Sequence, residues 1–305
     1  MARRGGGPGR GRSLGRGDDV SGGPVLCYHR VGGPLELGVT RVGRAVFARQ
    51  MTALAKAGWK TLSLAQFAHR LQPGNSASRI PHSALLLTFD DGYASLAQHA
   101  YPVLAELGFS ATTFLITDHV GASNTWDVRY TWRPLAHLDW RAVERWQQRG
   151  FDFASHTASH ARLTWLDDAR VADELGRARE TLVHRLGAAA GRAIAYPFGA
   201  ADTRVERLAR SAGYELGFGG VRGNGGAMSV PRVPVYLWDA GNVPLGLRAD
   251  GLGSVGRFVA HLANRCAVGT SWMLKLRRRI STESLPPSPR PPSHDIPCPR
   301  RSSLP

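Results

Sequence analysis

Residues 84–93 read Ala-Leu-Leu-Leu-Thr-Phe-Asp-Asp-Gly-Tyr, and this stretch decides the fold. Its first six residues form an apolar run with the length and composition expected of a β-strand that is buried on both faces. The run ends at two carboxylates and a glycine, which are residue types that favour a turn. The stretch therefore predicts a buried strand that stops at a polar loop.

Three further short apolar runs have the same character, at Val25–Tyr28, Ala111–Ile116 and Ala193–Tyr196. Amphipathic segments separate such runs, and four of them end in glycine followed by an aromatic residue: Gly58-Trp59, Gly108-Phe109, Gly150-Phe151 and Gly213-Tyr214. Glycine is favoured just after a helix because it adopts positive φ without steric cost. Strands and helices that alternate in this way predict an α/β fold with a parallel sheet or barrel.

We expect a single domain over residues 23–280, with its chemistry-bearing motifs within residues 84–240. Residues 1–22 are rich in Arg and Gly and residues 281–305 in Pro and Ser, so both are predicted to be disordered tails. The formal net charge is +16, and part of the excess lies in the tails. The basic tails suit electrostatic contact with an anionic surface, but no helix-turn-helix, zinc-finger or RNA-recognition pattern predicts a specific nucleic-acid partner.

No apolar stretch reaches the roughly 18 residues that indicate a membrane-spanning helix. The N-terminal residues also lack the apolar segment of a secretory signal peptide. We therefore expect a location in the cytoplasm or at the membrane periphery. The three cysteines, Cys27, Cys266 and Cys298, are widely spaced and odd in number, which predicts neither a disulfide framework nor a zinc finger.

Polar or turn-forming residues follow the predicted strands, at His29, Asp90-Asp91, His156 and Pro197-Phe198. In a parallel α/β barrel the carboxyl ends of the strands meet at one rim, and active sites lie there. We expect these four segments to deliver their side chains to that rim.

Asp90 and Asp91 are adjacent in sequence, so their charges repel unless a positive group compensates. Neighbouring residues of an extended chain point in opposite directions, so one carboxylate can bind a metal while the other acts as a base. The alternative is a strand that ends in an ordinary Asp-Gly turn without a catalytic role.

His156 and His160 lie four residues apart, and at that spacing both imidazoles can reach one metal ion. They can also be an unrelated pair on a helix surface. With one of the two aspartates they form a 2-His-1-carboxylate set, which leaves open positions for water and substrate. A site of that kind, with a second carboxylate free to accept a proton, suits hydrolysis. Non-haem iron oxygenases use the same ligand set and are a rival interpretation.

These segments resemble the motifs of the polysaccharide deacetylases, carbohydrate esterase family 4, whose catalytic unit is the NodB homology domain. Residues 88–92 (Thr-Phe-Asp-Asp-Gly) are similar to the first motif, residues 156–160 (His-Thr-Ala-Ser-His) to the second and residues 196–199 (Tyr-Pro-Phe-Gly) to the third. Residues 27–31 (Cys-Tyr-His-Arg-Val) resemble the opening strand of the poly-N-acetylglucosamine deacetylase subgroup. The resemblance implies a distorted, incomplete (β/α) barrel and metal-dependent removal of N-acetyl groups from an N-acetylhexosamine-containing polysaccharide or glycan precursor.

The resemblance also implies a role for each motif residue. Asp90 is expected to be the general base. The expected metal ligands are Asp91, His156 and His160, and the metal of the family is usually Zn²⁺. The backbone N–H of Phe198 is expected to help hold the oxyanion.

Contacts with the sugar substrate are expected from two places. Tyr196 and Pro197 belong to the third motif. Trp126 and Asp127 lie in a loop after the predicted strand Ala111–Ile116, where an aromatic ring beside a polar group suits stacking on a sugar. Trp126 can equally serve to anchor that loop.

Two features depart from the family pattern. Ala195 stands where an arginine often steadies the base, and Arg192 and Arg232 are the candidates to replace it. The late Leu-x-His motif, whose histidine is the usual general acid, has no convincing counterpart, because His261 fits one face of a helix. His29 is the better candidate for a proton donor or base partner, although it can also be a structural histidine beneath the site.

These departures leave alternatives open. The same fold can hydrolyse an O-acetyl ester or a non-sugar amide. A catalytically impaired relative can bind glycan without hydrolysing it. The presence of Asp90 favours an enzyme, because a protein that only binds glycan does not need a base beside the metal.

Overall fold

The structure, a computed structural model, describes residues 23–33, 40–72, 83–124, 134–220 and 226–236. Its strands are β1 (Val25–Tyr28), β2 (Arg30–Val31), β3 (Arg41–Val42), β4 (Lys60–Thr61), β5 (Ala84–Phe89), β6 (Thr112–Leu115), β7 (Asp152–Ser155), β8 (Ala193–Ala195), β9 (Leu216–Phe218) and β10 (Val233–Pro234). Its helices are α1 (Arg44–Lys56), α2 (Leu64–Arg70), α3 (Ser95–His99), α4 (Tyr101–Glu106), α5 (Trp140–Gln147), α6 (Asp168–Leu186) and α7 (Thr203–Ser211). Single turns of 3-10 helix are η1 (Thr117–His119), η2 (Leu163–Trp165), η3 (Ala188–Gly191) and η4 (Pro197–Gly199).

Eight strands of the described part form one parallel sheet in the order β10-β1-β5-β6-β7-β8-β9, with β4 paired to the start of β5. β5 is buried along its whole length and lies between β1 and β6. At the far edge Val230 bridges to β9, and three residues later Val233 pairs with β1, so residues 230–234 curl the two edges toward each other. The arrangement is the distorted, incomplete (β/α) barrel that the motifs implied, and this prediction is confirmed.

The glycines predicted to follow helices behave as expected. Gly58, Gly108, Gly150 and Gly213 have φ values of 79°, 66°, 86° and 91°. A side chain at these angles would strain the backbone, whereas glycine adopts them freely. Each glycine lets the chain reverse from the end of a helix into the next strand.

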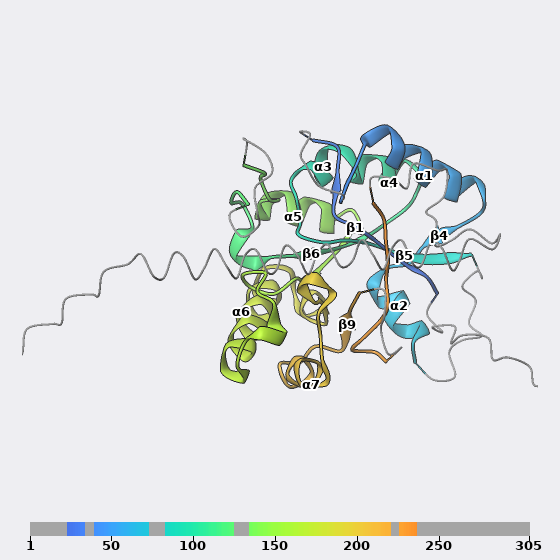
Figure 1. The fold of residues 1–305 in the computed structure, drawn as a ribbon. Helices are drawn as coiled ribbons and strands as arrows, with labels where there is room; N and C mark the ends of the chain where they lie inside the picture. Colours follow the sequence, from blue (N-terminus) through green and yellow to red (C-terminus); the bar gives the residue numbers. More distant parts are fainter. Residues whose placement is uncertain (1–22, 34–39, 73–82, 125–133, 221–225, 237–305) are drawn as a thin grey trace, which may run out of the picture.

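Hydrophobic side chains pack in layers on the two faces of the sheet. Outside it, one layer joins β1 and β5 to α1, α3, α4 and α5, and another joins β8 to α6 and α7. Figure 1 shows α1, α3 and α4 on one side of the strands and α6 and α7 on the other. The inner face carries alternate residues of the strands, such as Leu86 and Phe114, and these pack against Phe67 of α2. The sheet is therefore covered on both faces, which explains why its strands are uniformly apolar.

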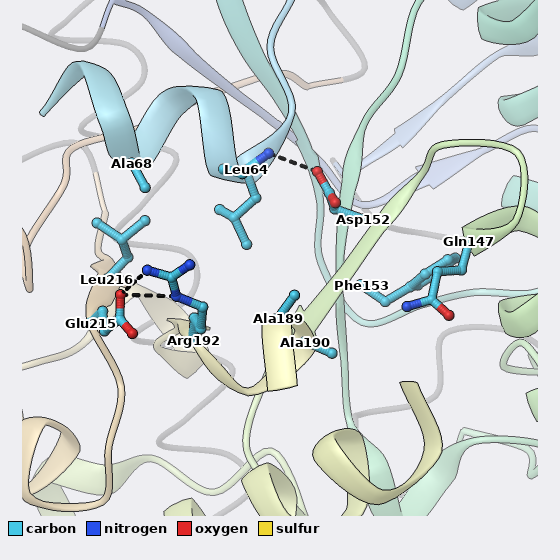
Figure 2. A pocket seen from close by; sticks show the side chains of 11 residues that line it. Leu64, Ala68, Gln147, Asp152, Phe153, Ala189, Ala190, Arg192, Glu215 and Leu216 are labelled. Atoms are coloured by element: carbon cyan, nitrogen blue, oxygen red, sulfur yellow. Dashed lines mark hydrogen bonds and ion pairs between the residues drawn. The ribbon is translucent and has the colours of Figure 1, made fainter. Parts of the chain in front are cut away.

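An open cleft lies where β7, β8 and β9 begin, between these strand starts and α2 (Figure 2). The backbone N–H of Leu64, at the start of α2, donates a 2.7 Å hydrogen bond to the Asp152 carboxylate. On the opposite side of the cleft, the Nε of Arg192 donates to Glu215 at 2.9 Å (Figure 2). This cleft lies at the amino ends of the strands, whereas the polar residues predicted to act in catalysis follow their carboxyl ends.

The described residues all fall within the domain predicted over residues 23–280, and the two predicted tails fall outside them. The domain bounds therefore stay predictions. Across the described ranges, no helix combines the length and the apolar character that crossing a bilayer requires.

Candidate active site

The three predicted metal ligands meet at the carboxyl end of the sheet. Asp91 follows β5, His156 follows β7, and His160 lies on the loop that continues from His156. The Oδ1 atom of Asp91 lies 3.4 Å from Nε2 of His156 and 3.5 Å from Nε2 of His160. All three side chains are buried, and their ligand atoms lie within 4.8 Å of one another.

This spacing fits a single tetrahedral cation. Ligand atoms that each lie about 2.0–2.1 Å from a zinc ion, at tetrahedral angles, are about 3.3 Å apart. The buried Oδ1 of Asp91 makes no hydrogen bond to any described residue. A buried carboxylate oxygen without a partner is unfavourable unless a positive group is bound. Two imidazole nitrogens and one carboxylate oxygen form a ligand set that suits zinc and similar divalent ions.

Both imidazoles present Nε2 to the same point. The Nδ1 of His156 lies 2.7 Å from the carbonyl oxygen of Ala195 and must donate to it, so in the neutral ring the lone pair lies on Nε2. Burial lowers the pKa of His160 to about 3, which keeps its ring neutral at physiological pH. A neutral imidazole is the form that binds a metal.

The loop that carries the two histidines is held by Glu174 of α6. One carboxylate oxygen of Glu174 accepts the backbone N–H groups of Ala158 and Ser159, at 3.1 Å and 2.9 Å. The other oxygen accepts the Ser159 hydroxyl at 2.5 Å. Glu174 is 8% exposed, so these bonds are shielded from water. Glu174 was not predicted from the sequence, because a glutamate in an amphipathic helix ordinarily faces solvent.

We expect Glu174→Ala to weaken zinc binding by about 10–100-fold, because partners that orient metal ligands have effects of this size. Titration of the purified variant with zinc against a competing chelator measures the affinity. The matched control is Asp173→Ala, which removes a neighbouring carboxylate that is 60% exposed and pairs with Arg177. Equal zinc affinity in both variants would show that Glu174 does not orient the metal ligands.

Backbone strain is concentrated at this site. Among the described residues, four residues other than glycine have positive φ: Asp91 (68°), Thr157 (67°), His160 (62°) and Phe198 (61°). This conformation is unfavourable for residues with a Cβ atom and persists only where surrounding contacts enforce it. All four belong to the motif segments, so the fold maintains strain where the predicted metal ligands and the predicted oxyanion donor lie.

His137 is one of the contacts that enforce the turn at Asp91. Its Nδ1 donates a 2.7 Å hydrogen bond to the Asp91 carbonyl oxygen, and its ring stacks on Tyr93 at 5.1 Å between centroids. His137 is 5% exposed. It lies far from every motif in the sequence, and no spacing signal indicated it.

Asp90, the predicted base, is held by an arginine. Arg232 donates two hydrogen bonds to the Asp90 carboxylate, from Nη1 to Oδ1 at 2.7 Å and from Nη2 to Oδ2 at 2.8 Å. Burial by itself raises the pKa of Asp90, but the Arg232 guanidinium and the nearby histidines outweigh it, so the pKa lies well below its usual range. Asp90 is therefore ionised, and its Oδ2 lies 4.0 Å from Nε2 of His156.

Arg232 therefore occupies the role that the sequence left open between two arginines. Its guanidinium approaches Asp90 from the residue directly before β10, the strand that pairs with β1, whereas Ala195 stands at the third-motif position. Arg192 lies at the other end of the strands with Glu215 and does not contact Asp90.

His29 and Cys27 lie on the other side of Asp90. The Cys27 thiol donates a 3.5 Å hydrogen bond to Oδ2 of Asp90, and burial raises the pKa of this thiol, so it stays protonated. Cys27, His29 and Asp90 offer side-chain atoms that lie within 4.8 Å of one another. His29 is half-buried, and its Nδ1 makes no hydrogen bond within the described ranges. The structure thus brings His29 to the site, as the strand-end argument predicted.

The third motif lies beside the metal ligands. The Phe198 ring contacts His160 edge-on, with 4.8 Å between centroids. The Phe198 backbone has a positive φ of 61°, and its N–H stays the predicted oxyanion donor. The expectation for Tyr196 needs correction: its side chain has no exposed surface and packs against the core formed with α6 and α7, so it cannot touch a substrate. Pro197 is buried as well, and its contact with substrate stays a prediction.

Three residues considered from the sequence fall outside the described residues. They are Trp126 and Asp127, predicted to contact substrate, and His261, weighed as a late general acid. Their roles stay predictions.

Comparison with known proteins gives the family. The sequence model described as "Polysaccharide deacetylase" matches residues 78–217. The chain is 28% identical over 194 residues to YxkH of Bacillus subtilis, a match that covers 64% of this chain and 63% of YxkH, less than two thirds of that relative. It is 27% identical over 215 residues to the poly-beta-1,6-N-acetyl-D-glucosamine N-deacetylase of Staphylococcus epidermidis, covering 64% of this chain and 71% of that protein.

A solved structure agrees with both matches. IcaB from Ammonifex degensii superposes with a TM-score of 0.59 and 25% identity, over 79% of this chain and 96% of that one. The matched segment of the family contains Asp90, Asp91, His156 and His160, and the barrel around them is shared. Residues 78–217 therefore match the polysaccharide deacetylase family, and this segment carries the candidate active-site residues that follow β5 and β7.

Proposed function

We propose that this protein is a hydrolase that removes N-acetyl groups from an N-acetylhexosamine polymer or a glycan precursor, with a divalent metal, Zn²⁺, as its cofactor. The observation that carries the proposal is a buried 2-His-1-carboxylate set beside an ionised carboxylate that is not needed as a ligand. The name of the Staphylococcus epidermidis relative supports the substrate class.

Asp91, His156 and His160 would hold the cation. When bound there, a divalent cation supplies acidity to a water molecule and polarises a carbonyl oxygen. This chemistry suits Asp90, because the bidentate contact with Arg232 makes its carboxylate a weak base that can accept a proton only from an acidified water.

Two other groups of the chain complete the proposed reaction. The Phe198 N–H, on the turn with positive φ, donates to the oxygen that becomes negative when the amide is attacked. His29 lies within reach of Asp90 on the end of β1, and it gives a proton to the amine that leaves. The products are acetate and a free amino sugar.

The Arg232 contact argues against an impaired binding protein. A protein that only binds glycan gains nothing from a buried arginine that holds a spare carboxylate ionised next to the metal ligands. Arg232 supplies the positive partner of Asp90 that an arginine at position 195 would otherwise give. This contact supports an enzyme over a protein that only binds glycan.

Acetate release from N-acetylglucosamine oligomers tests the proposal. We expect release by the wild-type protein to fall on treatment with a chelator and to return on adding Zn²⁺, but not with Mg²⁺, which prefers octahedral oxygen ligands. An O-acetylated oligomer serves as the comparison substrate. Activity that is indifferent to the chelator would contradict the metal assignment, and release only from the O-acetylated oligomer would identify an esterase.

A further inference from the structure

Trp165 is the large hydrophobic side chain that stands out at the surface of the described residues, at 42% exposed. It lies in η2, five residues after the metal ligand His160. A single exposed aromatic residue needs no explanation by itself. Trp165 is of functional interest because side-chain contacts connect it to the candidate active site.

A continuous row of side-chain contacts joins Trp165 to the candidate active site. The Arg162 guanidinium carbon lies 5.0 Å from the centre of the Trp165 ring and 5.7 Å from the centre of the Phe198 ring. The Phe198 ring in turn contacts the His160 ring, 4.8 Å between centroids. Arg162 therefore bridges the third motif and Trp165, and this series of contacts leads from His160 to the protein surface.

The backbone that carries Arg162 and Trp165 is held in place by local contacts. Leu163 is fully buried in the core formed with α6 and α7. The Trp165 backbone N–H donates to the Arg162 carbonyl at 3.0 Å, and that of Leu166 donates to Leu163 at 3.1 Å. Directly afterwards Asp167 caps the first turn of α6. A side chain fixed in this way loses little conformational entropy when it binds a ligand.

The exposed surface suits a sugar. Arg162 lies over one face of the Trp165 ring, and 42% of the tryptophan is exposed to solvent. The C–H groups on one side of a hexose ring pack well on an aromatic face. Guanidinium N–H groups can donate to hydroxyl or acetamido oxygens nearby.

We propose that Trp165 and Arg162 form a second sugar-binding subsite, which holds an N-acetylhexosamine unit next to the one that loses its acetyl group. The inference rests on the proposed function and deepens it, because it makes the substrate a chain of several sugars and not a single one. Trp165 acts in substrate binding and does not touch the reacting atoms.

The experiment compares acetate release from N-acetylglucosamine oligomers of increasing length in the wild type and in Trp165→Ala. In the wild type, kcat/KM rises with chain length. In Trp165→Ala we expect KM for the longest oligomer to rise about tenfold, the effect of losing one aromatic stacking contact, with kcat little changed. Trp165→Phe, which keeps an aromatic face, should recover most of the loss. An unchanged KM in Trp165→Ala would overturn the subsite.

Trp140→Ala is the matched control. Trp140 stacks on Arg185, 5.3 Å from the ring centre, in a tryptophan–arginine pair that joins α5 to α6 and does not touch the metal ligands. We expect its KM values to match the wild type at every chain length. A KM increase of equal size in Trp140→Ala would show that loss of any such pair disturbs the protein, and would overturn the assignment to Trp165.

A binding measurement separates this inference from the proposed reaction. Calorimetric titration of N-acetylglucosamine oligomers into Asp90→Asn and into Asp90→Asn/Trp165→Ala reports affinity without turnover. Weaker binding by the double variant supports the subsite, even if the wild type releases no acetate and the proposed reaction fails. Equal affinities of the two variants would overturn the subsite while leaving the deacetylase proposal intact.

Discussion

Asp90→Asn is expected to lower kcat by about 10²–10⁴-fold while the protein keeps its metal, the range that loss of a general base produces. An asparagine side chain preserves the shape of the aspartate but cannot accept the proton of the attacking water. Asp91, His156 and His160 are unchanged, so the ligand set for the cation stays complete. Acetate release and the metal content of the same purified sample measure the two effects separately.

His156→Ala is the comparison for that result. It removes one of the three ligand atoms, so we expect loss of both metal and acetate release. Together the two variants distinguish a residue that binds the cation, His156, from one that accepts the proton of the attacking water, Asp90. Activity of Asp90→Asn equal to the wild type would exclude Asp90 as the base.

Arg232→Met is expected to destabilise the protein by about 3–5 kcal/mol, because it leaves the Asp90 carboxylate buried without its positive partner. Methionine fills much of the same space, so the effect comes from the charge and not from a cavity. Urea unfolding followed by circular dichroism gives the change in the free energy of unfolding. We also expect a large loss of acetate release, since Arg232 fixes the orientation of Asp90.

Two further variants make this prediction specific. Arg232→Met/Asp90→Asn removes the unpaired charge as well and should recover much of the lost stability. Arg192→Met breaks the pair with Glu215, in which both side chains are about half exposed, and should change stability by only about 0–1 kcal/mol. Equal losses in the free energy of unfolding for Arg232→Met and Arg192→Met would show that burial of the Asp90–Arg232 pair adds nothing to stability.

The strands that the sequence predicts well are those buried along their length. Val25–Tyr28 and Ala84–Phe89 coincide with β1 and β5, because a strand covered on both faces needs apolar residues at every position. β4 and β10 have two residues each and were not predicted. Strands of this length carry no pattern of their own and are defined by the neighbouring strand.

The residues of the candidate site also fall into those that the sequence indicated and those that it did not. His156 and His160 could be proposed as ligands because their spacing lets both imidazoles reach one metal ion, and the choice of Asp91 over Asp90 came from the family resemblance. Glu174 and His137 could not, because each reaches the site by folding from a distant segment and has an ordinary sequence context. Arg232 was one of two candidates, and only its place directly before β10, beside β1, distinguished it. Tyr196 was misassigned because a motif gives the identity of a side chain but not the face it occupies.

The first and last strands of the described chain lie next to each other, and each contributes to Asp90: β1 leads to His29 and Cys27, and the segment before β10 brings Arg232. The segment that matches the family, residues 78–217, contains none of these three. During synthesis on the ribosome, the acidic pair emerges long before the guanidinium that must neutralise one member of it. The Asp90 carboxylate therefore gains its buried positive partner only when the last described strand has paired with the first.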